Sequence, residues 1–93
     1  RPIGEPMAER DIVMVEWNDS VSQSRWRDRK DTKKDLPVAR CRTFGEVLED
    51  VDEYIMVAGN VDDTNDNVDH VECIPRSAIR KVTVLKKAKK AEC

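Results

Sequence analysis

The sequence is poor in the side chains from which active sites and metal centres are usually built. Its 93 residues include one histidine, two tryptophans, one tyrosine and one phenylalanine. It has neither a GxSxG motif nor a glycine-rich loop that could cradle phosphates. Its many carboxylates lie mostly in turn-forming stretches, where solvation is the default. We therefore predict no catalytic residues, no cofactor and a protein that is not an enzyme.

Cysteine is also scarce and badly placed for a shared site. Cys41, Cys73 and Cys93 stand 32 and 20 residues apart, so the chain has no CxxC pair. His70 and Cys73 form one HxxC pair, which would supply only half of a zinc site. The alternative is a half-buried strand cysteine beside a surface histidine, and we predict no metal. Such cysteines favour a reducing, cytoplasmic compartment.

Long apolar segments are absent as well. No run of roughly 18 apolar residues exists, so we expect no membrane span. The opening RPIGEP lacks the apolar core of a signal peptide, and we expect residues 1–6 to be an added remnant before a natural start at Met7. The length predicts one small domain over residues 7–87 with a flexible basic tail over 88–93.

Charge is plentiful and segregated, although the net charge is only −2. Residues 25–42 hold eight Arg or Lys against three Asp, residues 46–69 hold nine Asp or Glu with no Arg or Lys, and residues 76–90 hold seven Arg or Lys with no acid. These blocks could pair across the fold, pair between subunits, or face different partners.

The first part of the chain predicts a strand followed by a long polar segment. DIVMVEW, residues 11–17, is β-rich, with Val13, Val15 and Trp17 on one face. We expect Trp17 to belong to the core. Residues 18–37 are polar and turn-forming, which is long for a structureless loop, and we expect a helical turn starting at Ser20.

Residues 38–58 fit either a helix or two strands. Apolar and aromatic positions recur at helical spacing, at Phe44, Val47, Leu48, Val51, Tyr54 and Ile55. The alternative is two strands, ARCRTFGEVLED and YIMVAGNV, joined by an acidic turn at 51–53, with Gly45 marking a bend. Periodicity alone leaves both open.

The last third predicts a hairpin and a tight corner. GNVDDTNDNVD, residues 59–69, is typical of a hairpin tip. A short strand, VECI, then meets Pro75, RSAI is too short for a proper helix, and KVTVL is a strand. A strand, a Pro-containing single turn and a strand are how small barrels form their last corner.

From Arg40 to Lys87 the pattern resembles the Sm-like small β-barrels, the branch that includes the bacterial RNA chaperone Hfq. The matching positions are Gly45, Val47, Asp50 or Asp52, Tyr54–Val57 and Ala78-Ile79. This resemblance favours strands over the helix. It implies an all-β, five-stranded Sm/SH3-like barrel with a long loop between strands 1 and 2 and a short 3-10 turn before the last strand.

The complete chain resembles a family of short proteins encoded by phages and prophages. The shared positions are Val15, Trp17, Asp19, Ser20, Trp26, Gly45, Ile74, Pro75 and Ile79. The resemblance implies a phage accessory protein in the cytoplasm of an infected or lysogenic cell.

Function is expected in binding, and the stretch SRWRDRKDTKK is the candidate surface, through Arg25, Trp26, Arg27, Arg29, Lys30, Lys33 and Lys34. Our leading hypothesis is docking on a host protein, since tryptophan and arginine are natural hot spots. The alternatives are single-stranded nucleic acid, RNA above all, or a ring that sequesters a nucleotide signal. Trp26 could instead cap an open end of the barrel while its arginines stay solvated.

We also expect a homo-oligomer. Sm-like barrels close into rings by pairing the fourth strand of one subunit with the fifth of the next, which removes two exposed sheet edges. Here the pairing edges would be VECI and KVTVL, through Val71, Cys73, Val82 and Val84.

Overall fold

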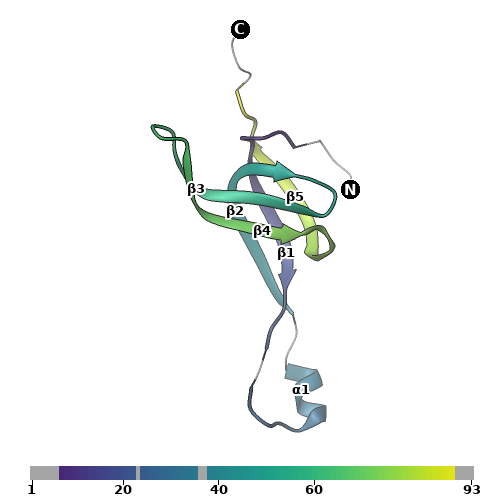
Figure 1. Ribbon diagram of the computed structural model, residues 1–93. Coiled ribbons are helices and arrows are strands. Elements are labelled where there is room, and N and C mark those ends of the chain that lie inside the picture. The colour runs from purple at the N-terminus through teal and green to yellow at the C-terminus, as the bar shows by residue number, and fades with distance from the viewer. Residues whose placement is uncertain (1–6, 23, 36–37, 90–93) are drawn as a thin grey trace.

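The structure, a computed structural model, describes residues 7–22, 24–35 and 38–89. The expected remnant 1–6 and the end of the expected tail lie outside the described residues. The elements, in order, are β1 (Ile12–Asp19), α1 (Arg29–Asp35), β2 (Ala39–Asp50), β3 (Tyr54–Asp62), β4 (Asn67–Pro75), the 3-10 turn η1 (Arg76–Ala78) and β5 (Ile79–Lys86) (Figure 1). The all-β class, the long first connection and the 3-10 turn before the last strand are confirmed.

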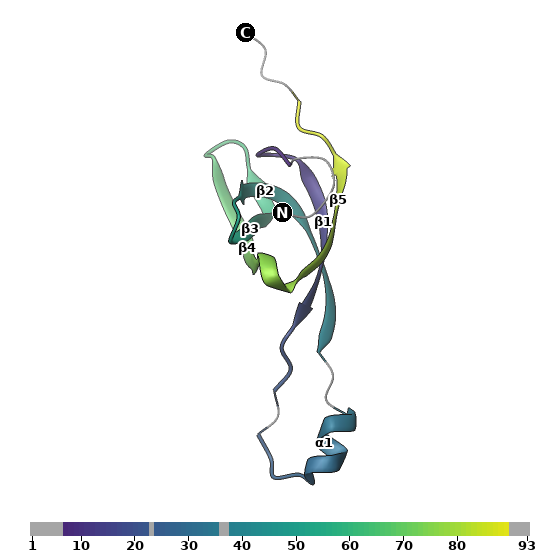
Figure 2. The same ribbon diagram turned by 90° about the vertical axis from the view of Figure 1, so that its right-hand side faces the viewer.

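The strands form one antiparallel sheet in the order β4-β3-β2-β1-β5. The outermost strands, β4 and β5, are its two edges, so strand pairing leaves the sheet open. Both views show it strongly bent: β3 and β4 cross over β1 and β5 in Figure 1 and lie on the opposite side of the molecule from them in Figure 2. The core therefore lies between two halves of one folded sheet.

Residues 39–50 and 54–62 are strands, which decides against the helix, and Gly45 lies at the bend. β2 pairs with β1 from Ala39 to Glu46 and with β3 from Glu46 to Asp50, so it changes partner beside Gly45. A Cβ at Gly45 would lie 2.5 Å from the carbonyl oxygen of Ala58 on β3. The strands approach too closely here for any side chain, which confirms the predicted bend.

The core is small and dominated by β-branched residues. Its fully buried members come from four strands, namely Val13, Val15, Val47, Ile55, Val57 and Ile74. Trp17 packs partly against this cluster, and its indole Nε1 donates a hydrogen bond to Thr43 Oγ1 at 2.9 Å. Trp17 therefore lies on the core face of β1, as the alternation predicted, but at the margin of the core and only partly buried.

The second hairpin is longer than the sequence predicted. β3 and β4 pair out to Asp62 and Asn67, which leaves only residues 63–66 as the tip. Consequently the predicted short strand VECI is the end of a nine-residue strand, and most of the predicted tip is paired. Asn and Asp are tolerated in these strands because cross-strand pairs such as Val61 with Val68 stabilise the pairing of β3 with β4.

Arg76 fastens the last corner to the β2–β3 turn. Its backbone N–H donates to the carbonyl of Glu53 at 2.8 Å, and its Nη2 donates to the carbonyl of Val51 at 2.6 Å and to Asp50 Oδ1. The side chains of Arg76 and Asp50 are only 13% and 5% exposed, so this ion pair is shielded from solvent. It positions η1 and hence the start of β5.

Candidate interaction surfaces

The described part of the segment between β1 and β2 forms a projecting arm, which we define as residues 20–22, 24–35 and 38. It extends away from the sheet beyond the paired ends of the two strands, and α1 lies at its far end (Figures 1 and 2). The helix begins at Arg29, so the predicted start at Ser20 is wrong. Asp28 caps it instead: its Oδ2 accepts from the backbone N–H groups of Lys30 and Asp31 at 3.1 and 3.2 Å.

Trp26 lies on the arm and contacts nothing that could bury it. Its relative exposure is 103%, against complete burial for the core valines of β1. The hypothesis that its indole caps an open end of a barrel is therefore wrong. A fully solvated indole is uncommon, because tryptophan is highly buried on average in folded proteins.

All seven predicted binding residues lie on the arm. Arg25, Trp26 and Arg27 belong to the extended stretch before α1, and the remaining four are on the helix, namely Arg29, Lys30, Lys33 and Lys34. Every one of them is exposed. Asp28 and Asp31 are interspersed among them, so the basic character is partly offset within the arm itself.

The acidic stretch lies elsewhere. The far end of the β3–β4 hairpin carries Asp62, Asp63 and Asp66, and it leaves the sheet at a different place from the arm (Figures 1 and 2). Of the alternatives for the charge blocks, pairing of the arm with this hairpin within one molecule does not fit this arrangement. The two blocks face different surroundings.

The four residues predicted at the oligomer edges fall into two groups. Val71 and Cys73 are exposed on β4, whereas Val82 and Val84 on β5 are half-buried and pack against the core. Both strands are edges of the sheet, as that hypothesis requires. On β5, however, the accessible feature is the backbone edge and not the two valines.

An apolar hollow on the outer face of the sheet was missed at the sequence level. It measures about 370 Å³ and is lined by Ile12, Phe44, Gly45, Glu46, Ala58, Gly59 and Val61. Phe44, which lines the hollow, is 52% exposed. The alternation of DIVMVEW places Ile12 opposite the core face, which is the one signal that could have pointed here.

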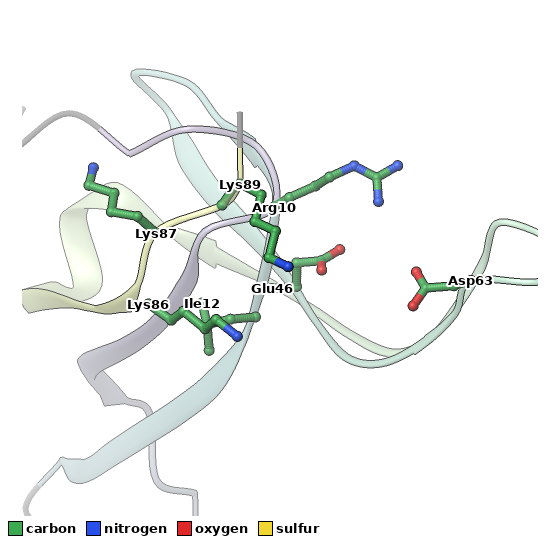
Figure 3. A pocket seen from close by; sticks show the side chains of 8 residues that line it. Arg10, Ile12, Glu46, Asp63, Lys86, Lys87 and Lys89 are labelled. Atoms are coloured by element: carbon green, nitrogen blue, oxygen red, sulfur yellow. The ribbon is translucent and has the colours of Figure 1, made fainter. Parts of the chain in front are cut away.

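A second, charged hollow of about 340 Å³ adjoins the first and shares Ile12 and Glu46 with it. Its other lining residues are Arg10, Asp63, Lys86, Lys87, Ala88 and Lys89 (Figure 3). In Figure 3 the amino group of Lys87 points away from the carboxylates of Glu46 and Asp63. Cations and carboxylates are thus mixed here, which does not define a site for one sign of charge.

Asp11 is a buried carboxylate that joins the two ends of the described domain. Its side chain is 1% exposed and accepts hydrogen bonds from the backbone N–H groups of Ala88 at 2.8 Å and Ala8 at 2.9 Å, with Lys87 Nζ at 3.5 Å. These hydrogen bonds lower the pKa of Asp11 below its usual 3.8, and the bond from the backbone of Ala88 has the largest effect. Its role is structural.

The described residues contain no cluster of three or more His, Cys, Asp or Glu that could hold a metal ion. His70 and Cys73 are both exposed on β4. Within the same residues, no helix has the length and apolarity needed to cross a membrane.

These surfaces define a small sheet protein with one projecting arm. Comparison with known proteins adds no family to this description: no family model matches the chain, and neither a curated protein nor a solved structure is significantly similar to it.

Proposed function

We propose that this chain is a non-enzymatic binding protein that docks on a host protein through its arm, as a phage-encoded accessory factor would. The observation that carries the proposal is the complete exposure of Trp26 between two arginines, on a segment that the sheet does not need for its own packing. Tryptophan and arginine are the residues most enriched at interface hot spots.

Burial of the indole by a partner would supply a large share of the binding free energy. An aromatic side chain buries 150–250 Å², which corresponds to about 4–6 kcal/mol at roughly 25 cal/mol per Å². Ordering of the arm and loss of translational freedom would offset part of this gain. The charged side chains of α1 would then steer the encounter with an acidic partner surface.

A protein partner fits the arm better than a single-stranded nucleic acid does. Sequence-tolerant nucleic-acid binders stack successive bases on several rings along a basic groove. The arm carries one aromatic ring, and carboxylate side chains lie among its arginines and lysines. RNA or DNA binding is therefore the alternative that the test has to remove.

We further propose an Sm/SH3-like architecture for the bent sheet, with copies pairing edge to edge. The support is the strand order, which leaves β4 and β5 as the outer strands. β4 carries Asp69 and Glu72, whereas β5 carries Arg80 and Lys81, so the two edges have opposite charge. Such pairing would not involve Trp26.

The test is recovery of a partner from host lysate by the wild type, by Trp26→Ala and by Val21→Ala. Val21 is a matched control because it is an exposed apolar residue on the same arm. We expect one protein that the wild type and Val21→Ala retain and Trp26→Ala loses. Equal retention by all three variants, or none by the wild type, would refute docking through Trp26.

An electrophoretic shift assay with single-stranded RNA and DNA at two salt concentrations separates the alternative. No shift at low salt removes the nucleic-acid hypothesis. A shift with a steep salt dependence that Trp26→Ala abolishes would replace the protein partner with a nucleic acid.

A further inference from the structure

Two arginines on β2 lie at the base of the arm, on the face of the strand opposite the core. Arg40 and Arg42 are exposed, whereas Cys41 and Thr43, which alternate with them, are half-buried. The two arginines end the basic block of residues 25–42 but belong to the sheet and not to the arm. Within the part of the chain that the structure describes, neither side chain makes an ion pair. Both guanidinium groups are therefore available to a partner.

One carboxylate lies beside this pair, and cations flank it on both sides. In the register of the sheet, Glu16 on β1 is opposite Arg42 on one side and opposite Lys81 of β5 on the other. The residue opposite Arg40 is the uncharged Asn18. Three cations thus stand against one carboxylate, so this part of the sheet is positive although the whole chain has a net charge of −2.

The other carboxylates of β1 and β2 lie away from the arginines. Asp19 ends β1, where alternation places it on the opposite face of the strand from Glu16. Glu46 shares the face of the arginines but lies further along β2, beyond the cross-strand pair of Phe44 with Met14. The positive surface therefore extends from the arginines towards the arm and not towards the apolar hollow.

We propose that Arg40 and Arg42 bind an acidic, extended segment of the protein that docks on the arm. This assignment rests on the proposed function, which places a host protein at the arm, and it adds the chemistry of a second contact with that protein. β2 begins at Ala39 and continues directly from the arm (Figures 1 and 2), so a protein held by the arm lies within reach of these arginines.

The spacing of the arginines selects an extended segment. Residues two apart on a strand have Cα atoms about 7 Å apart and face the same side. Alternate residues of an extended peptide have the same spacing, so Glu or Asp at every second position would meet both Arg40 and Arg42. Edge-to-edge pairing of copies leaves this contact open, because β2 lies inside the sheet and would bind through its face.

The guanidinium group selects a carboxylate. Its planar fork binds a carboxylate through two parallel N–H···O bonds, which a lysine ammonium cannot do. Phosphates of a single-stranded nucleic acid are the competing ligand, because they accept the same fork. The single ring of the arm favours the peptide, since sequence-tolerant nucleic-acid binders use several rings.

The experiment is an NMR titration of the full chain with two synthetic peptides of the same length and composition, each with five Glu among Thr residues. In the first peptide Glu stands at every second position, and in the second at every third. We expect the first peptide to shift the amide resonances around Arg40 and Arg42 and its binding to weaken with salt. We expect the second to bind at least about threefold more weakly, because it cannot meet both arginines at once.

Two double variants and one control locate the contact. Arg40→Gln with Arg42→Gln should weaken binding of the first peptide at least about fivefold, and Arg40→Lys with Arg42→Lys should weaken it about two- to threefold by removing the fork at constant charge. The control, Lys86→Gln with Lys89→Gln, removes the same charge from exposed positions elsewhere and should change binding by less than about twofold. All these side chains are exposed, and the spectrum of each variant reports whether its fold is kept.

Four results would overturn the proposal. They are no shift of the β2 amides by the first peptide at low salt, equal affinity for the two peptides, an equal loss of binding in the Gln variant and the control, or tighter binding of single-stranded oligothymidylate than of the first peptide by the same arginines.

These outcomes are separate from failure of the proposed function. A host protein that is retained through Trp26, without peptide binding by the arginines, refutes the acidic segment alone. Peptide binding that depends on both arginines, with no host protein retained through Trp26, refutes the docking of the arm and leaves the contact on β2.

Discussion

Gly45→Ala should destabilise the fold far more than Gly59→Ala, although both glycines line the same hollow. A Cβ at position 45 would lie 2.5 Å from the carbonyl oxygen of Ala58 and 2.9 Å from its carbonyl carbon. Carbon atoms in contact lie about 3.5–4.0 Å apart, so the β2 and β3 backbones would have to separate by roughly 1 Å. The atoms that must move are backbone atoms in paired strands and cannot rotate away.

The magnitude follows from overpacking. Forced insertion of a methyl group into a close-packed site costs about 1–3 kcal/mol, and the rigid neighbour places this case at the upper end, at about 2–3 kcal/mol. For a domain of this size, 2 kcal/mol corresponds to a melting temperature lower by about 8–16 °C. At position 59 the new Cβ would meet His70 Cβ at 3.3 Å, which a small shift relieves. The gain from restricting the unfolded chain, about 0.4–1 kcal/mol, then offsets much of the cost.

The assay is urea denaturation followed by fluorescence, with Trp17 as the reporter of the core margin. We expect the midpoint of Gly45→Ala to move to lower urea with an unchanged slope, and that of Gly59→Ala to stay near the wild type. A Gly45→Ala protein within about 0.5 kcal/mol of the wild type would show that β2 and β3 leave room for a side chain at position 45 and that the bend does not require glycine.

Three further predictions concern polar contacts. Asp11→Asn should lower the free energy of unfolding at pH 7 by about 1.5–3 kcal/mol, the contribution of hydrogen bonds to a charged group. Because the pKa of Asp11 is lowered in the folded protein, the wild-type advantage should persist above pH 3.8 and vanish as the pH falls through the lower folded value, which urea titrations across this range measure. The pKa of Tyr54 is raised above 10.0, first by its hydrogen bond to Glu49, so Glu49→Gln should lower the midpoint of the ultraviolet titration of this single tyrosine; an unmoved midpoint contradicts the contact. Asp50→Ala should cost about 3–5 kcal/mol by leaving Arg76 buried without its carboxylate, whereas Asp50→Leu with Arg76→Met should recover most of that loss in chemical denaturation.

The sequence predicted the strands well where alternation was simple. On β1, Val13 and Val15 alternate strictly and are buried as expected. β2 and β3 were ambiguous for a physical reason: the register of their pairing shifts between Val47 and Glu49, which breaks the period of two and imitates helical spacing. Only the resemblance to Sm-like proteins favoured strands.

Two features of the arm, the start of its helix and the exposure of Trp26, could not be predicted from local sequence signals. Ser20 and Asp28 are both good helix-capping residues, and nothing in the sequence decides between them. The exposure of Trp26 could not be predicted either, because burial depends on which distant elements pack against a residue. The hollow was missed for the same reason: Phe44, Gly59 and Val61 come together only when β2 and β3 pair and bend.

The place of β1 in the sheet has a consequence for synthesis on the ribosome. β1 lies between β2 and β5, and Val13 pairs with Val84, so one side of this apolar strand has no partner until almost all of the domain has been translated. At 5–20 residues per second, the roughly 70 intervening residues take about 4–14 s. During that time β1 is available to chaperones and to other nascent chains. Completion of the domain therefore depends on its last strand, and a chain that ends before residue 79 would keep β1 paired with β2 on one side only.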